Sequence, residues 1–303
     1  MLVPKSFLDD LRSRLRLSDI VGKRVKLSRA GREFKACCPF HSEKSASFYI
    51  NDEKGFYHCF GCGAHGDHIG FLMRNDNRGF MDAVEELAQQ AGLQVPKPSP
   101  QEMERARGKE RLVKMMDQVT RYYQARLFEQ KEILAYLTNR GLSLETIQSF
   151  RLGYSPQNGR DLIAHLKKDG YTDAEMVEAG VTKKSDRDGS FFAFFRDRVM
   201  FPVTDRRGQT IAFGARVLPE HIRPIDPDAG KPPKYINSGE TALFQKGHIL
   251  YNESHARTAA GKGMPIIVCE GYADVIALWQ AGFMGAVAPL GTCLLYTSPS
   301  PRD

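Results

Sequence analysis

The chain has 303 residues, of which 42% are hydrophobic, and its formal net charge is +7. This length exceeds that of a single small module and indicates two or three domains. The net charge and the pI of about 9.0 favour an anionic partner, nucleic acid ahead of membrane, because the sequence carries no amphipathic basic helix and no lipidation signal.

The cellular compartment is predicted from what the sequence lacks. No signal peptide precedes Ser6, and the apolar run 266–269 is too short to span a bilayer. A disulfide framework suits a small secreted domain and does not suit this chain. We therefore expect a cytoplasmic protein in a reducing environment.

The first predicted element is a short amphipathic helix capped by Ser6, with Asp9 in its first turn. Its apolar residues recur at helical spacing: Phe7, Leu8, Leu11 and Leu15. Four strand patterns follow, at 25–27, 33–36, 48–50 and 55–58. Two further helical patterns lie between Asp67 and Gly92. Residues 1–95 are therefore predicted to form a ribbon of short strands flanked by helices.

Two pairs of metal-binding side chains lie within this segment, each pair separated by two residues. The pairs are Cys38 with His41 and Cys59 with Cys62. Such spacing supplies two ligands from each knuckle and closes a tetrahedron around zinc. Because three thiolates and one imidazole leave no position for water, we expect one structural zinc ion per chain.

Other cysteines and histidines lie near these pairs. Cys37 is adjacent, but only Cys38 keeps the two-residue spacing to His41. Three histidines could compete as ligands and are expected instead at the surface or around the ligands: His58, His65 and His68. Cys269 and Cys293 have no partner pattern.

The run Pro96-Lys97-Pro98-Ser99-Pro100 predicts a linker over 96–110. The charged segment Arg105–Lys114 is expected to be the solvated face of a helix that continues to about Gln130. Helical patterns then cover 112–128, 133–139, 144–150 and 172–179, the last with a capping box. Strand patterns cover 191–194, 199–203, 210–217 and 248–251. Residues 219–233 contain five prolines and are predicted to be a loop, so the middle region is predicted to be α+β.

The last predicted unit is a βαβ unit. Residues 265–269 have the pattern of a buried strand, a helix follows to about Ala281, and 285–288 form a second short strand. Ligands bind at the carboxyl ends of parallel strands, where Glu270 lies, and Asp274 follows one helical turn later. Glu270 is either a metal ligand or general base, or a carboxylate that the helix dipole stabilises.

At this point the sequence resembles one family, the bacterial replicative DNA primases. The cysteine and histidine pairs resemble the zinc-binding domain of that family. Five further motifs match its RNA-polymerase domain in the same order: Asn139-Arg-Gly141, Arg198-Val-Met-Phe-Pro202, Phe213-Gly-Ala-Arg216, Pro233-Lys-Tyr-Ile-Asn-Ser238 and Glu270-Gly-Tyr-Ala-Asp274. The resemblance covers Ser6 to Thr292.

The resemblance implies a multidomain fold of mixed α+β and α/β type. It begins with the zinc ribbon (1–95) and the linker (96–110). A basic α+β subdomain (111–262) then leads into the start of a Toprim domain (263–292). The implied function is synthesis of short RNA primers on single-stranded DNA from ribonucleoside triphosphates during chromosome replication. Implied partners include the replicative helicase and single-strand-binding protein, at the replication fork in the nucleoid, with no membrane.

The resemblance also implies roles for individual residues. Glu270 and Asp274 match the catalytic positions, which hold Mg²⁺ or Mn²⁺ through carboxylate oxygens. Template- or nucleotide-binding positions match Arg140, Arg216, Lys234, Asn237, Ser238 and Lys246. In the ribbon, three cations lie near the aromatic residues Phe48, Tyr49 and Phe56: Arg32, Lys35 and Lys44. These aromatics either stack on unpaired bases or form the small core of the module.

The family carries an Asp-x-Asp pair on a later strand, and none occurs after Thr292. Residues 293–303 resemble translated sequencing-adapter sequence and are expected to be an artefactual tail. We therefore expect this polypeptide to bind zinc, to make little or no primer because its catalytic metal site is incomplete, and to lack the helicase-binding region. A domain cut at this point would leave strand 285–288 as an exposed edge.

Two alternative functions are considered. The first is a non-enzymatic zinc-ribbon protein that binds single-stranded DNA, which differs from a primase only in the segment after Thr292. The second is another Toprim enzyme, such as a topoisomerase or a recombination protein. A topoisomerase needs a domain with a nucleophilic tyrosine, and no segment of the sequence resembles one.

Overall fold

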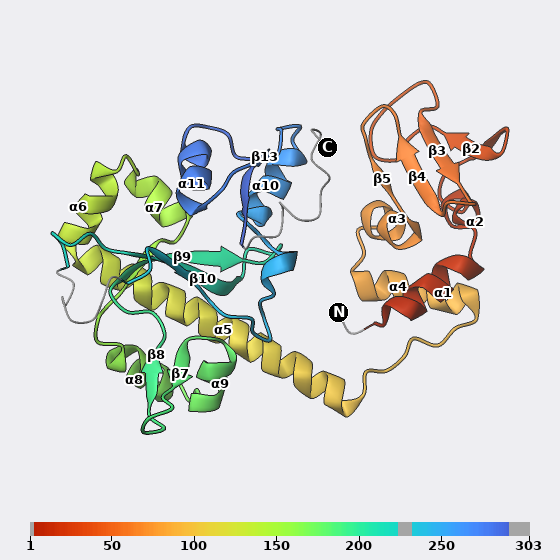
Figure 1. Cartoon of the computed structure of the whole chain (residues 1–303). Helices are drawn as coiled ribbons and strands as arrows, with labels where there is room; N and C mark the ends of the chain where they lie inside the picture. The colour runs from red at the N-terminus through yellow and green to blue at the C-terminus, as the bar shows by residue number, and fades with distance from the viewer. Residues whose placement is uncertain (1–2, 224–231, 291–303) are drawn as a thin grey trace, which may run out of the picture. The chain divides into compact units, whose positions relative to one another are not determined.

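The structure is a computed structural model that describes residues 3–223 and 232–290. The described residues form two compact units, which divide between Arg105 and Ala106 (Figure 1). The expected tail 293–303 lies outside the described residues, as does the greater part of the predicted loop 219–233.

The first unit is an antiparallel ribbon flanked by four helices. The helices are α1 (Lys5–Arg14), α2 (Leu17–Gly22), α3 (His68–Asn75) and α4 (Phe80–Ala91). The strands are β1 (Ser28–Ala30), β2 (Glu33–Ala36), β3 (Phe48–Asn51), β4 (Phe56–Cys59) and β5 (His65–Gly66). These strands pair in the order β1-β2-β3-β4-β5, so each strand pairs with its neighbours in the sequence. The predicted ribbon is confirmed.

One hydrophobic core holds this unit together. Phe48 and Ile50 point inward from β3 because successive side chains of a strand alternate between its faces. The rings of Phe48 and Tyr57 are 5.0 Å apart between centroids, and Phe71 of α3 packs edge-on against Tyr57 at 5.7 Å. Leu11 of α1 is also fully buried in this core. Aromatic packing therefore joins the ribbon to the helices.

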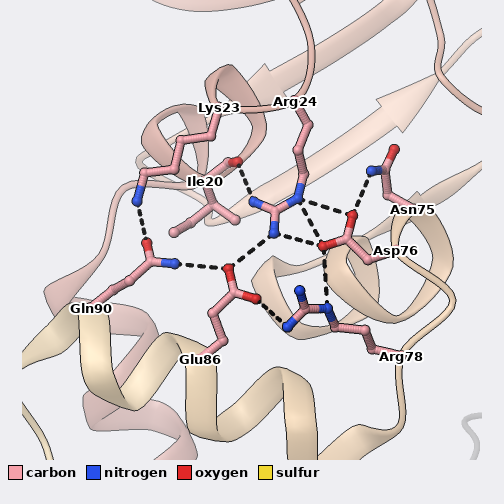
Figure 2. Close-up of polar contacts among 8 residues, drawn as sticks. All are labelled: Ile20, Lys23, Arg24, Asn75, Asp76, Arg78, Glu86 and Gln90. Carbon is pink, nitrogen blue, oxygen red and sulfur yellow. Dashed lines mark hydrogen bonds and ion pairs between the residues drawn. The ribbon is translucent and has the colours of Figure 1, made fainter.

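An ion-pair network links the end of α2 to α3 and α4 (Figure 2). The Nε of Arg24 donates to both carboxylate oxygens of Asp76, at 3.0 and 2.9 Å. The Nη2 of Arg24 donates to Glu86 at 3.0 Å. Arg78 pairs with Glu86 at 2.7 Å. The hydrogen bond from Arg24 holds the pKa of Asp76 below its usual range. The side chains of Arg24 and Asp76 are only 18% and 16% exposed, so solvent screens this pair weakly.

The long helix α5 (Pro100–Glu129) starts within the predicted linker segment, and from Ala106 onward it belongs to the second unit. The other helices are α6 (Lys131–Asn139), α7 (Leu144–Ser149), α8 (Arg160–Lys168), α9 (Asp173–Glu178), α10 (Glu253–Ala260), α11 (Tyr272–Gln280) and the 3₁₀ turn η2 (Lys246–His248). The strands are β6 (Gly153–Ser155), β7 (Thr182–Lys184), β8 (Phe191–Ala193), β9 (Arg198–Thr204), β10 (Thr210–Val217), β11 (Tyr235–Asn237), β12 (Leu250–Tyr251), β13 (Ile267–Val268) and β14 (Ala286–Pro289). The capping box at Thr172 is present as predicted.

A four-stranded antiparallel sheet, in the order β11-β10-β9-β6, forms the centre of this unit. Met200 and Phe213 point to one face and pack with α5, which runs beside β9 and β10 in Figure 1. Val199 and Phe201 point to the other face and pack with α6, α7 and α11. Because both faces are covered, β9 and the first part of β10 are buried along their length.

The predicted βαβ unit is present, with β13 and β14 parallel and α11 between them. β12, which precedes this unit in the chain, pairs antiparallel with the edge of β14 that faces away from β13. The strand order is therefore β12-β14-β13. The expectation that strand 285–288 would form an exposed edge is therefore wrong. Residues from outside the βαβ unit supply its second neighbour.

The prediction of a buried strand at 265–269 is also wrong. The side chains of Ile266 and Val268 are 51% and 59% exposed. β13 is an edge strand within the described residues, and Ile266 and Val268, two residues apart, lie on one face of it that is open to solvent. An apolar run thus forms a strand without being buried on both faces.

Three boundaries differ from the predictions. The first helix begins at Lys5, because the Pro4 carbonyl accepts from Leu8 N, so Ser6 lies inside the first turn and does not cap it. The first ribbon strand is 28–30 in place of 25–27, because the tight turn at Gly31 sets Ala30 opposite Glu33. His248 belongs to a 3₁₀ turn, and the strand starts at Leu250.

The hydrophobic periodicity of the sequence did not predict several short elements, namely α8, α10, β6, β7 and β11.

None of the helices in the described ranges is both long and apolar enough to cross a membrane.

Replacing Arg24 by Met is expected to lower the free energy of unfolding of the first unit by about 2 kcal/mol, because two charge-assisted hydrogen-bond partners lose their donor. Hydrogen exchange at the amides of α3 and α4, measured across a denaturant series, reports this change. Arg14→Met is the control, since Arg14 pairs with Asp10 in a solvent-exposed contact and its loss should change stability by no more than about 0.5 kcal/mol. Equal effects of the two substitutions would contradict the importance of the network.

His68 makes the stability of the first unit depend on pH. Burial lowers the pKa of His68, although its Nε2 donates to the Leu15 carbonyl at 2.9 Å. Because the folded pKa lies below the unfolded value of about 6.5, the unfolded chain binds the proton first. Stability is complete above about pH 6.5 and is lost as the pH falls below that value.

The His68→Gln variant keeps an amide donor but does not titrate, so it should lack this part of the pH dependence. Pulse proteolysis in urea at several pH values measures both proteins, and any effect of pH on metal binding is common to both. Parallel pH profiles for the two proteins would refute the assignment.

Candidate functional site

The four predicted metal ligands meet in the first unit. The ligand atoms of Cys38, His41, Cys59 and Cys62 all lie within 4.8 Å of one another. Cys59 lies at the end of β4, and Cys62 follows in the turn between β4 and β5. The β2–β3 connection carries Cys38 and His41, so the pairing of β2, β3 and β4 brings the two knuckles together.

The distances fit a tetrahedral zinc ion. Two thiolates that bind one zinc at about 2.3 Å lie about 3.8 Å apart, and the Sγ atoms of Cys38 and Cys62 are separated by 3.8 Å. The Nδ1 of His41 lies 3.8 Å from the Sγ of Cys59. His41 would therefore present Nδ1 to the metal.

Two residues that sequence reasoning missed support these ligands. Glu43 lies 3.2 Å from the Nε2 of His41 and accepts from the backbone N–H of Cys38 at 2.7 Å. Ser47 donates to Glu43 and lies 3.2 Å from the Sγ of Cys59. A carboxylate on Nε2 fixes the tautomer that leaves Nδ1 available to a metal. The hydrogen bond from Ser47 lowers the pKa of Glu43, which keeps this carboxylate ionised.

The thiols differ in how readily they ionise. Burial raises the pKa of Cys38 to about 12. Burial also opposes ionisation of Cys59, but hydrogen bonds from Ser47 and from the backbone N–H of Cys62 and Gly61 lower its pKa to about 6. A bound cation would favour the ionised form of all three thiols.

Gly61 occupies a position where no side chain fits. A Cβ atom there would lie 2.7 Å from the Nε2 of His41 and 2.9 Å from the Oγ of Ser47. The close approach of the second knuckle to His41 therefore requires glycine between Cys59 and Cys62.

The neighbouring residues fall outside the cluster. His68 is buried and donates to the Leu15 carbonyl, and Cys37 is an exposed thiol. Of the aromatics considered for base stacking, Phe48 is fully buried in the core, whereas Phe56 is 39% exposed. The sequence did not single out Phe60, which is 73% exposed and packs edge-on against His58 at 4.6 Å.

The second unit contains an acidic cleft of about 440 Å³ at the carboxyl ends of β13 and β14. Glu270 and Asp274 both line it, together with Pro289 and Leu290 at the end of β14. Neither carboxylate makes an ion pair or a side-chain hydrogen bond within the described ranges. Both are exposed to solvent, so both can bind a cation in the cleft.

A second cleft, of about 240 Å³, lies beside the first and shares Tyr235, Ala273 and Asp274 with it. Arg140, at the end of α6, and Arg216, on β10, line this second cleft above an apolar floor that includes Phe201 and Ile276. The structure therefore brings two of the predicted basic residues together, next to one of the predicted carboxylates.

Glycine at position 214 allows this arrangement. A Cβ there would lie 2.3 Å from the ring of Tyr272, whose hydroxyl donates to the Oδ1 of Asn237 at 2.8 Å. This contact packs α11 directly onto β10 and places Asn237 on the wall of the acidic cleft.

The other predicted binding residues lie elsewhere. Lys234 is exposed and lines an open depression with Glu220 and His221, outside both clefts. Lys246 is half-buried in η2 and also lines neither cleft. Ser238 is buried, and its Oγ accepts from the backbone N–H of Phe213 at 3.0 Å. The Ser238 side chain thus adds a hydrogen bond to β10 directly after the end of β11.

Sequence comparison matches the chain to three family models. These are the CHC2 zinc finger over residues 3–103, the N-terminal domain of the DNA primase catalytic core over 122–257, and the Toprim domain over 265–297. The DNA primase of Pseudomonas putida is 43% identical over 296 residues, which cover 96% of this chain and 43% of that protein. The DNA primase of Haemophilus influenzae is 41% identical and is covered to 48%. The chain thus spans about half the length of the curated relatives it matches.

Solved structures give the same result. The zinc-binding and RNA polymerase domains of the Aquifex aeolicus primase superpose with a TM-score of 0.54 at 30% identity, covering 94% of this chain and 66% of that one. A primase catalytic domain bound to single-stranded DNA superposes with a TM-score of 0.53 at 36% identity, covering 62% of this chain and 57% of that one. The expected combination of a zinc ribbon, a catalytic core and a Toprim segment is confirmed.

Glu43→Gln is expected to weaken zinc binding by about tenfold, because the amide cannot hold the His41 tautomer and the Cys38 backbone as the carboxylate does. Competition with a chromophoric chelator measures the affinity. Glu53→Gln is the control, since Glu53 is an exposed carboxylate in the β3–β4 turn. An affinity unchanged by Glu43→Gln would show that this carboxylate does not support the ligands.

Proposed function

Since this chain belongs to the family of bacterial DNA primases, we propose that it serves in the synthesis of short RNA primers on single-stranded DNA from ribonucleoside triphosphates. The observation that carries the proposal is the pair of adjoining clefts in the second unit. One is lined by the carboxylates Glu270 and Asp274, and the other by the guanidinium groups of Arg140 and Arg216.

The acidic cleft is proposed to bind the catalytic divalent metal. Attack of a 3′-hydroxyl on an α-phosphate develops negative charge on the attacking and leaving oxygens, and Mg²⁺ or Mn²⁺ supplies the compensating charge when bound. Carboxylate oxygens are the ligands that such hard cations prefer. Glu270 and Asp274 would hold the metal, and Asn237 on the same wall would donate a hydrogen bond to a phosphate oxygen.

The basic cleft is proposed to bind the template. Cationic side chains neutralise backbone phosphates and supply affinity that does not depend on sequence. Arg140 and Arg216 would contact the template there, and Lys234 and Lys246 would contact it outside the clefts. Because the Ser238 hydroxyl is buried against Phe213, we assign it to support of the sheet edge.

In the first unit, Cys38, His41, Cys59 and Cys62 are proposed to ligate one structural zinc ion. A ribbon of short strands has little core of its own, so the metal would fix its two knuckles. We propose that residues 1–95 form the zinc ribbon, 96–110 the segment that connects it to the rest, 111–262 the basic α+β subdomain and 263–292 the start of the Toprim domain. We also propose that the protein acts in the cytoplasm at the replication fork, where the helicase and the single-strand-binding protein are the partners that the family implies.

Glu270→Gln is expected to reduce template-dependent incorporation of ribonucleotides by about 10²-fold or more, because an amide neither accepts a proton nor binds a hard cation as a carboxylate does. The measurement uses a protein that carries this chain, a single-stranded template and labelled ribonucleotides. Glu145→Gln, which alters an exposed carboxylate on α7, should retain full activity.

Binding of single-stranded DNA is measured in parallel. Retained binding with lost incorporation supports the catalytic assignment. Incorporation unaffected by Glu270→Gln would refute the catalytic assignment.

A further inference from the structure

Tyr136 lies against both arginines of the basic cleft. Its ring centroid is 5.8 Å from the Cζ of Arg140 and 5.8 Å from the Cζ of Arg216. Arg216 also donates from Nη1 to the Tyr136 hydroxyl at 2.5 Å. Tyr136 and Arg140 are four residues apart, so they share one face of α6 and its C-terminal end.

A second tyrosine contacts Arg216 from another element. Tyr235 on β11 stands directly opposite Arg216 on β10, and the Cζ of Arg216 is 5.8 Å from the Tyr235 ring. The side chain of Arg216 is thus held by one tyrosine from a helix and another from a strand.

These arginines have no carboxylate partner within the part of the chain that the structure describes. Neither Arg140 nor Arg216 forms an ion pair there, and the buried Nε of Arg216 has no acceptor. Asp274 is the one carboxylate among the residues that line the basic cleft. Aromatic faces therefore do the positioning that carboxylates do for Arg24 in the first unit.

Two cations beside one ring repel each other, and the ring offsets only part of that repulsion. An anion that contacts both would be favoured, and it would gain most if both guanidinium groups were already in position. A carboxylate partner would hold the arginines equally well but would neutralise them. A tyrosine holds them and leaves their charge available to a phosphate.

We infer that Tyr136 is a positioning residue, which holds Arg140 and Arg216 together for contact with a phosphate of bound single-stranded DNA. This inference rests on the proposed function, because it assumes that the basic cleft binds the template. Tyr136 itself need not touch the DNA.

The test measures binding of a fluorescent oligothymidylate to the zinc-loaded chain by anisotropy at low salt. Tyr136→Leu, which removes the ring, is expected to weaken binding by about fivefold, and Tyr136→Phe, which removes only the hydroxyl, by about twofold. Tyr122→Leu is the matched control and should leave binding unchanged. Tyr122 packs on Arg126 four residues later on α5, at 5.3 Å, and lines neither cleft.

The decisive comparison is made in the Arg140→Ala/Arg216→Ala background. If Tyr136 acts only through these arginines, Tyr136→Leu has no further effect there. A ring that stacks on bases, or one that only supports the fold, would weaken binding by the same factor in both backgrounds, and that result would overturn the inference.

The same variants also distinguish a failure of this inference from a failure of the proposed function. If Arg140→Ala/Arg216→Ala binds DNA as the parent does, the proposed template path is wrong. If that variant binds weakly but Tyr136→Leu binds normally, the template path stands and the role of Tyr136 is refuted.

Discussion

Burial of the β9–β10 pair on both faces is the constraint around which the second unit is organised. Met200 and Phe213 pack toward α5, whereas Val199 and Phe201 pack toward α6 and α11. Side chains alternate between the faces of a strand, so one pair of strands joins two hydrophobic cores. The same alternation places Gly214 and Arg216 on the side of α11, where the clefts form.

The first unit meets a different constraint, because its strands are only two to four residues long. Aromatic packing around Phe48 and Tyr57 supplies one connection between ribbon and helices, and the Arg24 network supplies another. The knuckles lie at the end of the ribbon, where Glu43 and Ser47 already orient the ligand atoms. Such preorganisation reduces the cost of ordering the site when the metal binds.

The two clefts of the second unit bring groups of opposite charge to adjoining surfaces and share a wall. Asp274 and Tyr235 line both clefts, so the carboxylates proposed to bind a cation lie next to the arginines proposed to bind phosphate. Phosphoryl transfer needs both in close proximity, since the metal and the nucleic-acid backbone contact neighbouring oxygens. Asp274 lines the basic cleft but forms no ion pair with Arg140 or Arg216 in the part of the chain that the structure describes.

The sequence alone predicted the metal cluster, the ribbon and the placement of Glu270 at a strand end, because spacing and periodicity are local properties. It could not predict that β12 would pair with β14, that the 265–269 strand would be exposed, or that Tyr136 and Tyr235 would enclose Arg216. The paired residues lie 19 positions apart in the chain for Arg216 and Tyr235, 39 for Leu250 and Pro289, and 80 for Tyr136 and Arg216. Only tertiary packing brings such residues together, and a local sequence pattern does not determine which distant side chain will contact a given residue.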